Sequence, residues 1–183
     1  MEQAGTPPTV SVTVTDDSIT VTDAGPGIPE STLQATLDYS VRVSTNSKYI
    51  SPTRGSQGNA LKTIIALPYV LDGESGRIDV STGGKGHKIT VKTDPIQQKP
   101  VINLSNSKPP IVKNGTSVVV HWPDSARLEL ESQNTEFLQL ASNFTMLNPH
   151  LAITVDVPQG NFECQPTDSK WTKWLPSDPT SPH

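Results

Sequence analysis

The chain has 183 residues, of which 33% are hydrophobic and 17% charged, and its formal net charge is −4. This small net charge excludes disorder through charge repulsion, and 14 basic against 18 acidic residues exclude a strongly basic nucleic-acid surface. The single cysteine excludes an internal disulfide framework, and no apolar run reaches the ~20 residues that span a bilayer. We therefore expect one acidic, soluble, cytoplasmic domain, with no secretory signal after Met1.

Two alternating segments stand near the start of the chain. Residues 9–14 and 18–22 alternate β-branched with small polar side chains, which predicts a β-hairpin with one buried face. A segment rich in glycine and proline follows, Asp23-Ala24-Gly25-Pro26-Gly27-Ile28-Pro29. Because Pro29 suits a first helical turn, a short helix is predicted over 30–38.

The middle of the chain combines an irregular polar stretch with an apolar helix. Residues 40–56 are typical of a long functional loop. From Gly58, apolar residues recur at helical spacing on nearly every side, which predicts a helix buried on most faces and ending near residues 72–73. Pro68 predicts a kink or an early stop in this helix.

The remaining chain alternates strands with one amphipathic helix. Strands are predicted over 77–82, 87–93, 100–104, 116–122 and 151–156. The Gly83-Gly84-Lys85-Gly86 segment is predicted to be the turn joining the first two of these strands, and an amphipathic helix over 132–147 is predicted from Phe137, Leu138, Leu140, Ala141, Phe144 and Leu147. The expected fold is an α+β two-layer sandwich, a mostly antiparallel sheet with helices on one face. Residues 1–157 form the expected domain, and 158–183 a C-terminal extension with Pro and Trp residues.

Three glycine-bearing breaks allow a chemical interpretation. Asp23, followed by Gly25 and Gly27, offers a carboxylate to a donor such as the exocyclic amine of a purine, while the backbone approaches a flat ligand closely. The alternative is an ordinary proline-containing turn.

The second and third breaks have similar alternatives. Residues 54–60 open the apolar helix, so free N–H groups and the helix dipole favour an anion, with Lys48 and Arg54 adding positive charge. The alternative is a glycine-rich connection with solvated basic side chains. Gly115-Thr116 places a hydroxyl at a strand start, where it can reach a base directly or through water. The alternative there is an ordinary strand start.

Together and in this order, the three breaks resemble the glycine boxes of the GHKL ATPases, which share the Bergerat nucleotide-binding fold. The chain is most similar to the topoisomerase VI B subunits of that family, through Ser44 to Gly58 and the Asn148-Pro149-His150 turn. The resemblance covers roughly residues 9–157. It implies that Asp23 binds the adenine amino group, that Gly25 and Gly27 shape the pocket beside the base and that Thr116 helps to hold the base. It also implies that Gly55, Gln57, Gly58 and Asn59 wrap the phosphates. The implied ATP-binding set is Asp23, Gly25, Gly27, Ile28, Lys48, Arg54, Gly55, Gln57, Gly58, Asn59 and Thr116.

The departures from the family concern catalysis. Relatives carry a general-base Glu and an Mg²⁺-binding Asn on a helix before the first strand, and no Asn lies upstream of Gly25. We assign no catalytic or metal-binding residue, since the histidines lack ligand spacing and Cys164 lacks a basic neighbour. Mg²⁺ is expected to accompany ATP through phosphates and water alone. Without a base, hydrolysis loses a factor of about 10²–10⁴.

We therefore expect an ATP-binding fragment with impaired hydrolysis, and the resemblance links it to DNA, and to a homodimer, only through a larger parent protein. Two alternatives remain open. One is a non-catalytic Bergerat-fold scaffold that binds a partner protein. The other is an ATPase core like those of histidine kinases or chaperones.

Overall fold

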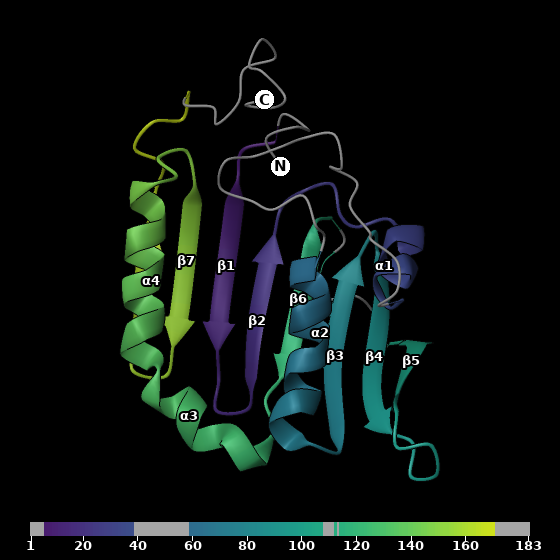
Figure 1. The fold of residues 1–183 in the computed structure, drawn as a ribbon. Coiled ribbons are helices and arrows are strands. Elements are labelled where there is room, and N and C mark those ends of the chain that lie inside the picture. Colours follow the sequence, from purple (N-terminus) through teal and green to yellow (C-terminus); the bar gives the residue numbers. More distant parts are fainter. Residues whose placement is uncertain (1–5, 39–58, 108–111, 113, 171–183) are drawn as a thin grey trace, which may run out of the picture.

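The computed structural model describes residues 6–38, 59–107, 112 and 114–170. Within these ranges the chain forms an 8-stranded sheet in the order β5-β4-β3-β6-β2-β1-β7-β8 (Figure 1). In chain order the elements are β1 (Thr9–Val14), β2 (Ser18–Asp23), α1 (Glu30–Thr36), α2 (Asn59–Asp72), β3 (Ser75–Thr82), β4 (Lys85–Thr93), β5 (Pro100–Asn106), β6 (Thr116–His121), η2 (Asp124–Ala126), α3 (Arg127–Ser132), α4 (Asn134–Met146), β7 (Ala152–Val157) and β8 (Gly160–Cys164). Only β1 and β7 pair in parallel; the other neighbouring strands are antiparallel.

The strand register sorts the side chains onto two faces. Ile19, Val120, Ile78 and Ile89 are successive cross-strand partners, so they share one face of the sheet. Buried residues of all four α-helices pack with this apolar face, here called the helix face (Figure 1). The alternate residues are mostly polar, many of them Ser and Thr, and form the polar face. The predicted α+β sandwich with helices on one face is confirmed.

Two hydrophobic cores lie against the helix face. The β3 core joins α1 and α2 to the middle strands and consists of Leu33, Ile65, Ile78, Val80, Ile89, Val91 and Val120. The β7 core joins α3 and α4 to the strands around β7 and consists of Val14, Leu130, Ala141, Leu151, Ile153, Val155 and Val157. The sheet is therefore covered in two side-by-side sections.

The local predictions for both hairpins are confirmed. β1 and β2 pair over the predicted residues, with Val12 opposite Val21. Gly83 and Gly84 both have positive φ and join β3 to β4, with Thr82 opposite Lys85. Glycine adopts this left-handed backbone without steric cost, which explains why the turn could be recognised from its residues.

The predicted end of α2 near residues 72–73 is confirmed, because the helix continues through Pro68 to Asp72. Of the kink or early stop expected at Pro68, the early stop is therefore wrong. Pro68 is fully buried, and packing of α2 against β3 offsets the hydrogen bond that a proline removes. Burial on most faces is also wrong, because Ile64 and Val70 are exposed. Lys62 instead is buried, and its Nζ donates to the carbonyl oxygen of Asp38 at 2.6 Å.

The C-terminal third differs further from the sequence analysis. The helix expected over 132–147 is confirmed as α4 (Asn134–Met146), whereas α3 (Arg127–Ser132), which precedes it across Gln133, was missed. Leu140, Phe144 and Leu147 are exposed, because α4 turns Ala141 toward the β7 core instead. The strand β8 was missed, since Gly160–Cys164 is short and partly polar; it pairs antiparallel with β7.

Candidate functional site

The loop after β2 is held in shape by its own first residue. Oδ1 of Asp23 accepts a hydrogen bond from the backbone N–H of Gly25 at 2.6 Å. Gly27 has a φ of 85°, a value that glycine adopts without strain. The described residues offer no hydrogen-bond partner for the second carboxylate oxygen of Asp23. That oxygen is therefore available to a ligand.

The sheet brings the first and third glycine boxes together. Asp23 on β2 lies opposite Thr116 on β6, so both side chains belong to the helix face. Gly115 has a φ of 87°, and a Cβ atom there would lie 2.0 Å from the carbonyl oxygen of Asp23. A glycine is required for this close approach. Asp23, Gly25, Gly27, Ile28 and Thr116 therefore lie at the same end of the sheet, and their predicted role in binding ATP stays a prediction.

A residue that the sequence analysis missed anchors the loop. Thr82 lies opposite Thr116 on β3, and its Oγ1 accepts a hydrogen bond from the N–H of Ile28 at 2.6 Å. The same hydroxyl donates to the carbonyl oxygen of Ile28 at 3.2 Å. The alternation of the predicted strand contained the signal, because Thr82 continues the buried series of Ile78 and Val80.

A cavity of about 510 Å³ lies between this loop and the β3–β4 hairpin. Its lining consists of Pro26, Gly27, Ile28, Pro29, Glu30, Thr82, Gly83, Lys85 and His87. Nζ of Lys85 lies 2.6 Å from Oε2 of Glu30, and this hydrogen bond and positive charge hold the pKa of Glu30 below its usual range. His87 is only 2% exposed.

The second glycine box lies largely outside the described residues. Lys48, Arg54, Gly55, Gln57 and Gly58 all belong to the range 39–58. Asn59 is the first residue of α2, so the backbone of that helix begins where the sequence predicted. The expected phosphate-binding part of the site stays a prediction.

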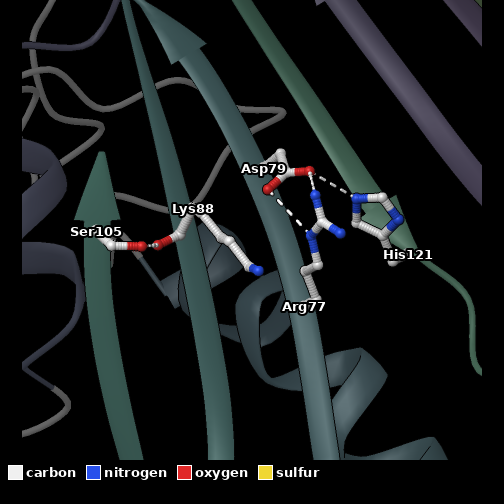
Figure 2. A network of polar contacts seen from close by, with 5 residues as sticks. All are labelled: Arg77, Asp79, Lys88, Ser105 and His121. Atoms are coloured by element: carbon white, nitrogen blue, oxygen red, sulfur yellow. Dashed lines mark hydrogen bonds and ion pairs between the residues drawn. The ribbon is translucent and has the colours of Figure 1, made fainter. Parts of the chain in front are cut away.

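A polar network occupies the opposite face of the sheet, as Figure 2 shows. Arg77 donates through Nη2 to Oδ2 of Asp79 at 2.6 Å, and Nε2 of His121 lies 2.8 Å from the same oxygen. Burial opposes ionisation of Asp79, but the hydrogen bonds from Arg77 and His121 outweigh it and lower the pKa of that carboxyl. Ser105 donates to the carbonyl oxygen of Lys88 nearby. Because Asp79 alternates with Ile78 and Val80, these contacts lie on the face away from the loop. Asp79 links β3 to His121 on β6, and Ser105 separately links β5 to β4.

The chemistry of the site is that of binding. The Asp23 carboxylate accepts hydrogen bonds, and the Thr116 hydroxyl both donates and accepts them. The neighbouring glycines have no side chains that would keep a ligand away from the backbone. In the part of the chain that the structure describes, no three His, Cys, Asp or Glu side chains are grouped to hold a metal ion. None of the helices in the described ranges is long and apolar enough to cross a membrane.

No protein-family model matches the sequence, and no curated protein matches it. Among solved structures, the chain is similar to the MutL ATPase domain of Aquifex aeolicus complexed with ADP, with 15% identity and a TM-score of 0.49. That match covers 91% of this chain and 59% of the other. A mutant of the same domain matches with 16% identity and a TM-score of 0.48, covering 88% of this chain and 56% of the other. The chain thus spans less than two thirds of these domains.

Proposed function

We propose that the chain is an ATP-binding domain of the GHKL type, similar to that of topoisomerase VI B subunits. The observation that carries the proposal is the cross-strand pair of Asp23 and Thr116, flanked by the close approach of Gly115 to Asp23. The pairing supports the resemblance, because residues 23 and 116 lie far apart in the sequence and are brought together only by the sheet.

The polar groups of this pair match the edge of adenine. The second oxygen of Asp23 accepts from the exocyclic amine, and the Thr116 hydroxyl donates to a ring nitrogen directly or through water. The loop at Gly25 and Gly27 presents backbone to the flat base. Residues 48–59 are proposed to bind the phosphates, with Mg²⁺ held by the phosphates and water.

Hydrolysis by this chain is proposed to be weak. Glu30 is the carboxylate lining the cavity, and its ion pair with Lys85 lowers its pKa. A carboxylate with a lowered pKa is a poor general base at neutral pH. A larger parent protein is proposed to supply the missing catalytic groups, any contact with DNA and any homodimer.

Isothermal titration with a non-hydrolysable ATP analogue tests binding. Because Asp23→Asn replaces an acceptor by an amide that also donates, we expect about a tenfold or greater loss of affinity. Asp79→Asn is the matched control, since it makes the same chemical change on the polar face and is expected to leave affinity unchanged. Absence of binding to the unaltered chain, or equal losses in both variants, contradicts the proposal.

A phosphate-release assay tests turnover separately. We expect a rate of phosphate release at least about 100-fold lower than that of an ATPase with its general base, because a general base accelerates the reaction by about 10²-fold or more. Turnover at the rate of a complete GHKL ATPase contradicts the proposed impairment while leaving nucleotide binding intact.

A scaffold that binds a partner protein is the second candidate. The exposed apolar series of Leu140 and Phe144 on α4 and Leu147 directly after it favours this candidate, because neighbouring exposed apolar side chains are typical of contact surfaces. An ATPase core like those of histidine kinases or chaperones shares the binding site of the first proposal. Nucleotide binding therefore separates both ATP-binding candidates from the scaffold.

A further inference from the structure

The strand β5 (Pro100–Asn106) forms one outer edge of the sheet (Figure 1). All of its residues pair with β4 through one side of the backbone. Within the described chain, residues 100–106 make no further backbone hydrogen bond, and the Ser105 hydroxyl bonds only to the carbonyl oxygen of Lys88. The unused N–H and C=O groups on the outer side of β5 are therefore a template for another strand.

The β5 edge lacks the features that usually protect an edge strand. Short length, charged side chains, interior prolines and β-bulges all discourage pairing with other chains. β5 carries no charged residue, its proline is the first residue, and its register with β4 is unbroken. The opposite edge of the sheet, β8 (Gly160–Cys164), is shorter and contains Glu163. Of the two edges, β5 is thus the one suited to pairing.

The apolar side chains of β5 are incompletely covered. Ile102 and Leu104 lie opposite Val91 and Ile89 and pack against the β3 core, yet both stay partly exposed. A neighbouring strand with apolar side chains on the helix face would cover them and extend the β3 core. The helix face therefore favours a partner strand with large apolar residues at every second position.

Three lysines without an ion pair flank the β5 edge. Lys88 and Lys92 lie on β4, opposite Ser105 and Val101, and belong to the polar face. Lys99 directly precedes β5. Within the described chain, no acidic side chain pairs with any of the three. The polar face beside β5 therefore favours negative charge on a partner.

The acidic side chain opposite Lys88 does not neutralise it. Asp79 bonds instead to Arg77 and His121, and Figure 2 shows no bond between its carboxylate and the Lys88 ammonium. A strand added to β5 would lie about 10 Å from β4 at the usual strand spacing. The long side chains of a lysine and a glutamate together span that distance, because the intervening Ser105 is small.

We propose that β5 binds an extended acidic segment of a partner protein as a further strand of the sheet. Its residues on the helix face are apolar and cover Ile102 and Leu104, and those on the polar face are Asp or Glu and pair with Lys88 and Lys92. Backbone hydrogen bonds supply affinity, and the alternation supplies specificity. A second copy of this chain is disfavoured, because its β4 lysines would add to the same positive charge. The proposal does not rest on nucleotide binding, since three strands separate β5 from β2, which carries Asp23.

NMR titration of the full chain with capped peptides tests the proposal. The probe is a peptide as long as β5 that alternates Val and Glu. One control alternates Val and Lys, and the other has the composition of the probe with its Glu residues in one block. We expect saturable shifts at the amides of residues 101–106, with a dissociation constant on the order of 100 μM for the probe. Both controls are expected to bind at least about tenfold more weakly.

Hydrogen exchange and two double variants complete the test. Because the outer-side amides of β5 gain partners, their exchange should slow in the unaltered chain, a measurement that needs no variant. K88Q/K92Q should weaken the probe about tenfold, since each charge pair contributes a few-fold. R127Q/K170Q is the matched control, which removes two positive charges from α3 and from the segment after β8 and should leave the affinity unchanged.

Four results would overturn the proposal. Equal binding of a control peptide would leave only non-specific attraction, and equal losses in both double variants would assign binding to net charge. Unchanged exchange of the β5 amides would exclude strand addition. Self-association of the chain that the probe competes away would assign the edge to a second copy, and tighter binding of an oligothymidylate at the same lysines would assign it to nucleic acid.

Discussion

The β3 core and the β7 core lie against the same face of one sheet, but only the β3 core borders the candidate site. In the β3 core, five of the seven residues are at most 1% exposed, while Val91 and Val120 are 4% and 7% exposed. The residues of the β7 core are 2–8% exposed. The section that supports the glycine-bearing loops is thus the more completely buried one.

The difference also shows in the helices. α1 follows directly after the loop at Gly27, and its residue Leu33 packs in the β3 core. The N–H of Leu33 donates to the carbonyl oxygen of Pro29 at 3.0 Å, which connects the helix to the end of that loop. α4 packs on the β7 core through Ala141 and leaves Leu140 and Phe144 exposed. The loop at Gly27, which positions the polar groups of the candidate site, is therefore attached to the core whose side chains are more completely buried.

The largest expected effect compares one buried leucine from each core. We expect Leu33→Ala in α1 and Leu130→Ala in α3 each to lower the free energy of unfolding by about 3–4 kcal/mol, because both leave a cavity in a core. Only Leu33→Ala should weaken binding of the ATP analogue, since it releases the loop at Gly27. Urea unfolding and titration measure the two quantities. Equal loss of binding in both variants would show that the cores do not act separately.

The second prediction compares two glycines of similar backbone conformation. Gly115→Ala should lower the free energy of unfolding by about 2 kcal/mol or more, because its φ is positive and the new Cβ meets the backbone of Asp23. Gly73→Ala has a φ of 84° but open space around the new Cβ, so about 1 kcal/mol is expected. Equal unfolding energies for the two variants would exclude a tight contact between Gly115 and Asp23.

Sequence patterns predicted the section around the site better than the section around α4. Strand alternation and the positive-φ glycines are local signals, so both hairpins could be anticipated. The meeting of Asp23 with Thr116 is a long-range contact, which only the family resemblance implied. The direction that α4 faces depends on which of its apolar stripes meets β7, and its sequence carries two: Phe137 with Ala141, and Leu140 with Phe144. Periodicity alone does not choose between them.

The cavity was missed for a related reason. His87 and Glu30 lie 57 residues apart in the sequence and share the cavity only because β4 pairs with β3 beneath α1. A histidine in a strand carries no local sign of the loop that will cover it. Thr82, in contrast, was missed although the alternation of the predicted strand places it on the same face as Ile78 and Val80.

The third prediction concerns pH and the polar face, which both sections share. Asp79 has a lowered pKa in the folded chain, so its ionised form stabilises the fold above its usual pKa of about 3.9, and this contribution is lost as the pH falls through the lower folded value. Asp79→Asn should cost about 1 kcal/mol at pH 7 and flatten the fall of stability below pH 5. Urea unfolding at a series of pH values measures both. Asp124→Asn, at an exposed ion pair, is the control, and an equal change there would assign the effect to net charge.

The smallest expected effect tests whether the exposed side of α4 belongs to the β7 core at all. Phe144→Ser should change the free energy of unfolding by less than about 0.5 kcal/mol, because the side chain is 45% exposed and lies outside that core. Phe137→Ser, on the same helix but packed against the β7 core, should cost about 2 kcal/mol. Unfolding at two protein concentrations is the measurement, since a second copy covering the series Leu140, Phe144 and Leu147 would make stability depend on concentration. A loss above about 1 kcal/mol in Phe144→Ser that does not depend on concentration would mean that another part of the same chain packs on α4 in solution. In that case the β7 core would extend beyond the residues that define it here, and the burial difference between the two sections would shrink.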